Sequence, residues 1–228
     1  MRPTLAELLK RPLVLWLASL GLAIAWDLGA QDMPVMHLLG TVRGFALRDE
    51  PLLSLGLHDG FRQLALALLA ALVLWTFWPG PSARAQRRER LAVLGAVLVS
   101  ILAVNLIKIN SLTSCPWDLA DFGGRAHHVS HWSWGIADGG RGHCFPGGHA
   151  SSAFAFVGLA LPGLTRGQRS GWWWLAAVLL MGVVAGAVQT LRGAHYPSHT
   201  LWTLVVCLGS AVLVWGVVMR GARMPARA

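Results

Sequence analysis

Long apolar runs alternate with short polar segments along the 228 residues of the chain. Leu, Ala and Val dominate these runs, and the alternation of period two that marks transmembrane β-strands is missing. Six runs are long enough, or nearly so, to cross a hydrocarbon core about 30 Å thick as helices. They are Leu13–Ala30, Phe61–Trp78, Leu91–Ile107, His149–Leu164, Trp172–Leu191 and Thr200–Met219. The pattern therefore predicts an all-α integral membrane bundle of six helices, forming one domain over residues 1–228.

The composition agrees with a membrane protein: 55% of the residues are hydrophobic and only 13% are charged. Soluble domains carry about a quarter charged residues, so an ordinary soluble enzyme or a disordered chain is excluded. The first run allows an alternative. Lys10 and Arg11, a short apolar stretch and Ala23-Ile24-Ala25 also resemble a secretory signal with its cleavage site. Cleavage there would leave five spans and would not move the later loops.

The net charge of +9 is distributed unevenly between the two sides of such a bundle. With the N-terminus inside, the inner segments hold 12 Lys and Arg against 2 Glu, a net +10. The outer segments hold 7 Lys and Arg against 8 acidic residues, a net −1. Short basic clusters between apolar runs follow the positive-inside rule rather than the pattern of a nucleic-acid binder. We therefore expect both termini in the cytoplasm of a bacterium, and loops 31–60 and 108–148 on the periplasmic face of the inner membrane.

Histidines gather on this outer face, where seven of the nine lie between residues 127 and 199. Lys108 and Arg192 end spans at the same level. The segment Pro146-Gly147-Gly148-His149 opens an apolar helix, and free amides at a helix N-terminus form an anion site. A histidine there can donate a proton to a leaving oxygen near neutral pH.

Two further histidines lie on either side of Pro197, a residue that fits the first turn of the last helix. His195 then lies in the preceding turn and His199 one helical turn beyond. A neutral imidazole is a competent nucleophile toward phosphorus when a second group orients it.

Together these segments resemble the type 2 phosphatidic acid phosphatase superfamily, which includes bacterial acid phosphatases and vanadium haloperoxidases. Its pattern is K-x6-R-P, then P-S-G-H, then S-R-x5-H-x3-D. The corresponding residues here are Lys108-x6-Cys115-Pro116, Pro146-Gly147-Gly148-His149 and Gln189-x5-His195-x3-His199. Order and internal spacing match over residues 108–199, and six spans with an outward-facing site are the layout of the family's membrane branch.

The resemblance implies a role for each matching residue. His195 would attack phosphorus and form a phospho-histidine, and His149 would protonate the leaving group. Lys108 and the amides of Gly147 and Gly148 would hold the phosphoryl oxygens. Water would then release phosphate.

Four positions depart from the family pattern: Cys115 and Gln189 replace arginines, Gly147 replaces a serine and His199 replaces the orienting aspartate. The site loses two guanidinium groups suited to bidentate phosphate binding. Arg192, three residues after Gln189 on the same helix face, is expected to compensate, and Arg125 and Arg141 in the long loop are alternatives.

The replacement of the aspartate has a separate consequence. A neutral His199 can accept a hydrogen bond from His195, but it cannot stabilise positive charge on His195 as a carboxylate would. This replacement leaves open the alternative that catalysis is slow, altered or lost.

Cys115 and Cys144 both lie in outer loops, in an oxidising compartment, next to the first two motifs. We therefore predict a disulfide between them, which would hold Lys108 near His149. Cys207, inside the last span, is expected to be a buried apolar side chain.

Metal binding is the main alternative for the loop histidines. His127, His128 and His131 could bind an ion together with Asp118 or Asp121, but their spacing is no recognised zinc pattern. No dinucleotide-binding, P-loop or nucleophile-elbow motif occurs in the structural context that such a motif requires. We expect neither a metal nor a cofactor.

The sequence thus predicts a phosphatase that hydrolyses a lipid phosphate or diphosphate from the periplasmic side. Undecaprenyl diphosphate, phosphatidylglycerol phosphate, phosphatidic acid and lipid A phosphate all fit. The alternatives are a lipid phosphotransferase with the same intermediate, and a degenerate protein that binds lipid headgroups. Transport is disfavoured because no buried charge pair or broken mid-span helix is evident. The expected partners are the lipid substrate and membrane lipids, with no nucleic acid.

Overall fold

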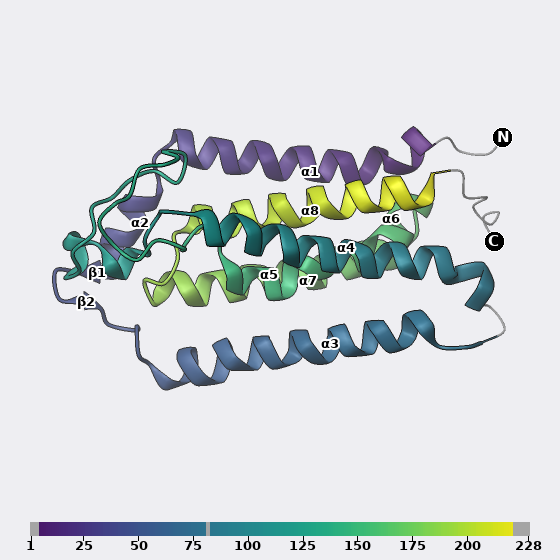
Figure 1. The fold of residues 1–228 in the computed structure, drawn as a ribbon, viewed down its shortest axis with the longest axis horizontal. Coiled ribbons are helices and arrows are strands. Elements are labelled where there is room, and N and C mark those ends of the chain that lie inside the picture. Colours follow the sequence, from purple (N-terminus) through teal and green to yellow (C-terminus); the bar gives the residue numbers. More distant parts are fainter. Residues whose placement is uncertain (1–4, 81–82, 221–228) are drawn as a thin grey trace.

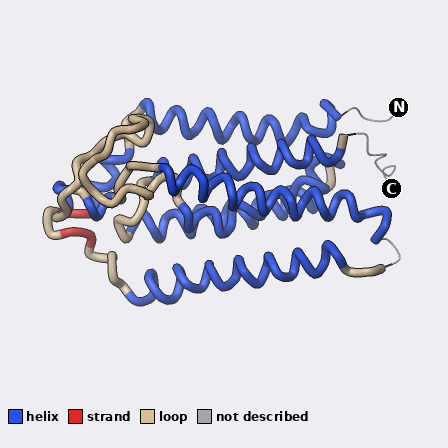
Figure 2. The backbone as a smooth tube through the Cα atoms, viewed as in Figure 1, coloured by secondary structure: helices blue, strands red, loops and turns tan. Residues whose placement is uncertain are grey.

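The computed structural model describes residues 5–80 and 83–220, and this part of the chain is mostly helical (Figures 1 and 2). The long helices are α1 (Leu5–Leu28), α3 (Gly60–Phe77), α4 (Ala83–Asn110), α7 (Arg169–Leu191) and α8 (Pro197–Met219). They run side by side, and α1 begins at the same end of the molecule at which α8 ends (Figure 1). Within these described ranges, five helices are long and apolar enough to cross a membrane.

Short elements gather at the opposite end (Figure 1). They are α2 (Asp32–Leu39), the strands β1 (Gly40–Thr41) and β2 (Gly44–Phe45), the π-helical segment η1 (Leu52–Asp59), and the 3₁₀ turns η2 (Pro116–Asp118) and η3 (Ala120–Phe122). The two strands pair antiparallel, with Gly40 opposite Phe45. The predicted loops 31–60 and 108–148 therefore form one layer over the end of the bundle.

The predicted span 149–164 is not one continuous α-helix. It is divided into α5 (Gly148–Phe154), the 3₁₀ segment η4 (Ala155–Ala160) and α6 (Leu161–Arg166). Pro162 lies in the first turn of α6 and has no N–H to donate to Gly158, so the α-helical ladder cannot continue through this point. This composite segment lies against α4, α7 and α8 in the centre of the bundle.

Small residues let α7 approach its neighbours closely. A Cβ atom at Gly182 would lie 2.0 Å from the ring of Phe154 in α5, and one at Gly186 would lie 2.4 Å from Thr200 in α8. Such contacts between small residues are typical of helices packed within membranes.

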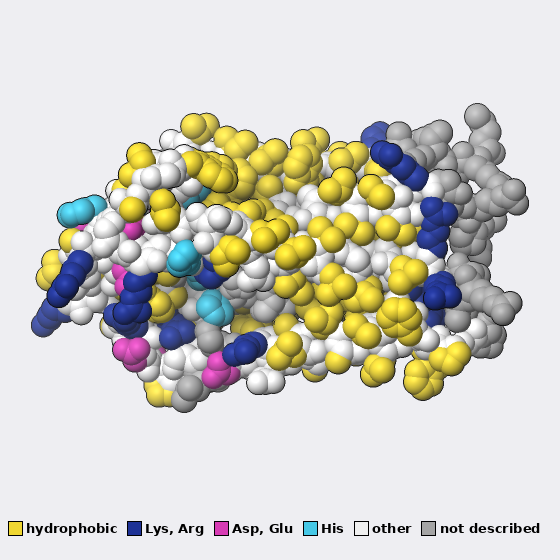
Figure 3. Space-filling view, in the orientation of Figure 1, with side chains coloured by type: hydrophobic (Ala, Val, Ile, Leu, Met, Phe, Trp, Pro, Cys, Tyr) yellow, Lys and Arg dark blue, Asp and Glu magenta, His cyan; other side chains and the backbone are white. Residues whose placement is uncertain are grey.

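The outer surface of the bundle is apolar. Large exposed side chains cover α1, α3, α4 and α7, and Lys and Arg lie at the two ends (Figure 3). A continuous apolar band of this kind belongs in lipid rather than in water. The chain is therefore a multi-pass membrane protein. α3 is the most peripheral helix: among its described residues only Leu72 and Thr76 are buried.

Candidate active site

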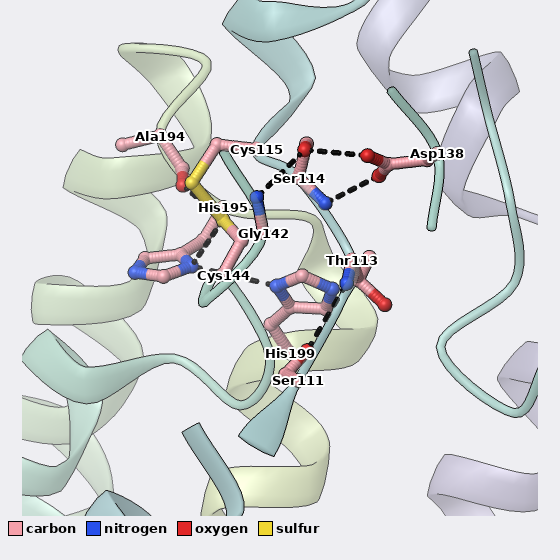
Figure 4. Close-up of a disulfide and its surroundings, with 10 residues drawn as sticks. All are labelled: Ser111, Thr113, Ser114, Cys115, Asp138, Gly142, Cys144, Ala194, His195 and His199. Atoms are coloured by element: carbon pink, nitrogen blue, oxygen red, sulfur yellow. Dashed lines mark hydrogen bonds between the residues drawn. A yellow bond between two sulfur atoms is a disulfide. The ribbon is translucent and has the colours of Figure 1, made fainter. Parts of the chain in front are cut away.

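A disulfide joins Cys115 to Cys144, with 5.2 Å between the Cα atoms, at the end of α4 (Figure 4). The predicted pairing is present, and Cys207 is a free, fully buried cysteine as expected. The bond links the segment that follows Lys108 to the segment that precedes His149. The first two motifs therefore meet at one point.

His195 lies in the turn between α7 and α8 and is only 3% exposed. The amides of Ala194 and His195 both donate to the carbonyl oxygen of Gln189, at 2.8 and 3.3 Å, which closes the turn over the end of α7. The Sγ atom of Cys144 lies 3.1 Å from the Ala194 oxygen and 3.4 Å from His195 Nδ1 (Figure 4). The disulfide therefore packs directly against the candidate nucleophile.

His199 is fully buried in the first turn of α8. Its Nδ1 atom lies 3.4 Å from Nδ1 of His195, so one ring donates and the other accepts (Figure 4). Its Nε2 atom has no hydrogen-bond partner in the described part of the chain. The rings of Phe145 and Tyr196 meet it edge-on, with centroids 5.2 and 5.0 Å away. His199 is thus held by aromatic packing in contact with His195.

His149 and Lys108 complete the group. The ring centroids of His149 and His195 are 5.7 Å apart, and a Cβ atom at Gly148 would lie 3.8 Å from Lys108 Nζ. Burial, and then the positive charges of Lys108 and His149, hold the pKa of His195 well below its ordinary value of 6.5. The imidazole of His195 is therefore neutral at physiological pH, which is the nucleophilic form.

Gly147 is placed differently from the expectation. Its N–H donates to the carbonyl oxygen of His199 at 3.1 Å, and its own oxygen accepts from the Thr203 hydroxyl at 3.0 Å. The Gly147 amide is thus used to hold α8 and is not available to a phosphoryl oxygen. A Cβ atom at this position would lie 3.4 Å from the His199 oxygen, which is an ordinary contact distance.

Arg192 contacts Gln189, the residue at one of the family's arginine positions. Its Nη1 atom lies 3.4 Å from Oε1 of Gln189, whose side chain is buried. Its Nε atom donates to the carbonyl oxygen of Arg48 at 2.9 Å. Among the described residues, Arg125 and Arg141 form no hydrogen bond or ion pair through their side chains.

A carboxylate that the sequence did not indicate supports the site from α1. Asp27 Oδ2 accepts from the indoles of Trp132 and Trp202, both at 2.8 Å, and lies 3.2 Å from His131 Nε2. The His131 ring stacks on Phe145, with centroids 4.3 Å apart. Burial lowers the pKa of His131, and Asp27 opposes this shift. No local motif could identify Asp27, because its partners lie more than 100 residues further along the chain.

The proposed metal ligands do not assemble as a group. In the part of the chain that the structure describes, His127, His128 and His131 do not converge with Asp118 or Asp121. His131 instead lies within 4.8 Å of Asp27 and Asp32. The two carboxylates already accept bonds from tryptophan indoles and from Ser198.

The fold and the site define an all-α membrane protein in which two buried histidines, a partly buried histidine and a partly buried lysine cluster at one end. The chain belongs to the PAP2 superfamily, whose family model matches residues 89–223, more than half of the sequence. Members of this family are phosphatases, and the match includes every motif from Lys108 to His199. No curated protein and no solved structure matches the chain.

Proposed function

We propose that the protein is a membrane phosphatase that hydrolyses a lipid phosphate or diphosphate through a phospho-histidine at His195. Phosphatase family membership supports the hydrolysis of a phosphate ester. The observation that carries the assignment is the buried, neutral His195, which contacts His199 through Nδ1 and faces the ring of His149.

In this mechanism the Nε2 atom of His195, the ring nitrogen turned away from His199 and the cystine, attacks phosphorus. The nitrogen–phosphorus bond forms as the bond from phosphorus to the leaving oxygen breaks, and His149 gives that oxygen a proton. Water then attacks phosphorus as His149 takes a proton from the water, the nitrogen–phosphorus bond breaks with its electron pair returning to His195 Nε2, and phosphate leaves. Lys108 stabilises the charge that develops on the phosphoryl oxygens. His199 fixes the orientation of the His195 ring.

Arg192 takes the role of the arginine that Gln189 replaces. Its contact with the Gln189 side chain supports this assignment, since it brings a guanidinium group back to the motif position. An arginine offers a planar set of donors that matches a phosphoryl group better than an ammonium does.

For the membrane arrangement we propose six crossings, cytoplasmic termini and a periplasmic active site in the inner membrane of a bacterium. The sixth crossing is the composite segment α5–η4–α6. At 1.5 Å per α-helical residue and about 2.0 Å per 3₁₀ residue, it is roughly 30 Å long, enough for a hydrocarbon core. The charge difference between the two ends of the bundle supports the orientation.

The lipid tails would lie beside α3. A cavity of about 410 Å³ separates α3 from the composite segment, and apolar side chains form most of its wall, among them Leu72, Trp75, Phe156 and Trp174. Glu89, Gly163 and Gln168 also line this cavity, so it lies toward the end of the bundle opposite His195, and only the far part of a long lipid tail would reach it.

A second candidate is a headgroup-binding protein without turnover. The observation that favours it is the replacement of the family's aspartate by His199, which removes the carboxylate that would stabilise a charged His195. A phosphotransferase would use the same intermediate and would differ only in passing the phosphoryl group to a lipid hydroxyl instead of water.

The test is phosphate release by the purified full-length protein in detergent, with a panel of lipid phosphates and diphosphates. We expect turnover and an acid-labile phospho-enzyme, and a loss of at least about 10³-fold in His195→Ala. His127→Ala, at an exposed loop histidine, is the matched control and should keep full activity. Full activity in His195→Ala would refute the mechanism. A wild-type protein with neither turnover nor phospho-enzyme would support the binding protein, and faster phosphate transfer to an added lipid alcohol than to water would indicate a phosphotransferase.

A further inference from the structure

The first outer loop packs on the turn that holds His195. Gly193 has a φ of +74°, and a Cβ atom there would lie 2.2 Å from the ring of Phe45. Only glycine satisfies both conditions. Phe45 is 5% exposed and packs against Phe122, with ring centroids 4.8 Å apart. The segment around β2 therefore packs on this turn.

This packing brings a second arginine to the site. The carbonyl oxygen of Arg48 accepts the bond from Arg192 Nε at 2.9 Å. The guanidinium of Arg48 lies over the ring of Trp117, 4.8 Å from its centroid, and the Trp117 amide donates to the Gly193 oxygen at 3.0 Å. Arg48 and Arg192, which are far apart in the sequence, thus lie beside the same turn. This turn contains Gly193, two residues before His195.

Neither arginine is paired with a carboxylate of the described residues, although Asp49 and Glu50 follow Arg48 in the sequence. Within the described ranges 5–80 and 83–220, no carboxylate lies at ion-pair distance from Arg48 or Arg192. Arg192 uses Nε and Nη1 and keeps Nη2 for another partner. The guanidinium of Arg48 makes no hydrogen bond to the described residues and is oriented by the Trp117 ring alone. Free guanidinium donors on a fixed backbone are suited to bind phosphate oxygens.

We propose that Arg48 provides a second anion subsite next to Arg192, and that this subsite binds another phosphate group of the substrate beside the one that reacts at His195, while Arg192 serves the reacting phosphoryl group. The site then favours lipids with two phosphate groups, either a diphosphate or a headgroup with a further phosphate, over lipid monophosphates. This inference rests on the proposed phosphatase activity for its effect on turnover.

When the substrate is a diphosphate, the bond that breaks is the one to the bridging oxygen. The His195 nitrogen bonds to the terminal phosphorus while the bond from that phosphorus to the bridging oxygen breaks. The bridging oxygen keeps the electron pair and leaves on the lipid monophosphate, with a proton from His149. Arg48 stabilises the charge on this leaving phosphate.

The first experiment compares kcat/KM for farnesyl diphosphate and farnesyl phosphate, which share one tail. A second pair, phosphatidylglycerol phosphate and phosphatidic acid, tests a further phosphate placed elsewhere in the headgroup. We expect Arg48→Gln to lose about 10-fold or more on the doubly phosphorylated substrate and little on the monophosphate. Arg48→Lys should be intermediate, because it keeps the charge and loses the planar donors. Arg43→Gln, at an exposed arginine of the same loop, should leave the ratio unchanged.

The second experiment measures binding without catalysis. The thermal shift of the full-length protein is recorded with methylenediphosphonate and with methylphosphonate. Arg48-dependent preference for the bisphosphonate in a protein without turnover would support the subsite and refute the hydrolase. Turnover with a substrate ratio that Arg48→Gln leaves unchanged would overturn the subsite and leave the hydrolase standing. Neither turnover nor preference would overturn both.

Discussion

The Nδ1 atom of His195 meets a cystine and a second imidazole. The Cys144 sulfur lies 3.4 Å from this atom, and Nδ1 of His199, the residue at the position of the family's aspartate, lies at the same distance. No carboxylate is hydrogen-bonded to the His195 ring in the described part of the chain. The protonation state of His195 is therefore determined by burial and by the positive charges of Lys108 and His149, all of which favour the neutral ring.

This environment predicts how activity depends on pH. Because the pKa of His195 lies well below 6.5, the acid limb of kcat/KM that arises from His195 should lie below pH 6.5. The neutral ring also affects stability. As the pH falls below 6.5, the unfolded chain binds a proton at this position that the folded protein does not, so the free energy of unfolding decreases. A pH series of kcat/KM checks the first effect, with His127→Ala as the control. An acid limb of kcat/KM centred at or above pH 6.5 in both the wild type and His127→Ala would contradict the first expectation.

Motif spacing predicted four residues that the structure brings together, but not all of their contacts. His195, His199, His149 and Lys108 come together as the resemblance implied. The bond from the Gly147 amide to α8 depends on how two helices approach each other, which no local pattern encodes. Arg48 and Asp27 were missed for the same reason, since each meets the site only through tertiary packing.

At the level of elements, hydrophobic runs located the long helices because an apolar stretch of about 20 residues has few alternatives in a bilayer. The internal structure of the span 149–164 was not predictable from hydropathy, because the mean hydropathy of a segment is the same whether it forms a 3₁₀ helix or an α-helix. Pro162 was the one local signal, since it cannot continue the ladder. The outer loops, which lack periodicity, gave no prediction of α2, of the strand pair or of the short 3₁₀ turns.

The disulfide connects the end of α4 to the start of α5 across a sequence separation of 29 residues. We predict that Cys115→Ser/Cys144→Ser loses about 3–4 kcal/mol of unfolding free energy, the loop-closure value for this length, together with most of the activity. Denaturant unfolding in detergent and phosphate release measure the two effects. Cys207→Ala, which leaves the cystine intact, is the control. Wild-type stability and activity in the double variant would show that packing alone holds the site.

At the scale of the whole molecule, the candidate site lies at one end of the apolar band, and a cluster of basic side chains lies at the other (Figure 3). This separation predicts a labelling pattern. In spheroplasts, a membrane-impermeant maleimide should label Ser130→Cys, in the exposed outer loop, and should not label Gln86→Cys, near the start of α4. Both should react after lysis. The reverse pattern in intact spheroplasts would invert the proposed orientation.

The cystine also changes what a break in the backbone does to the molecule. Residues 115–144 form a closed covalent ring, with α1 to α4 on one side and α5 to α8 on the other. A protease that cuts the loop once inside this ring leaves two fragments that remain one covalent molecule, joined beside His195. The segment that covers the site can therefore be opened without separating the fragment that carries Lys108 from the one that carries the histidines.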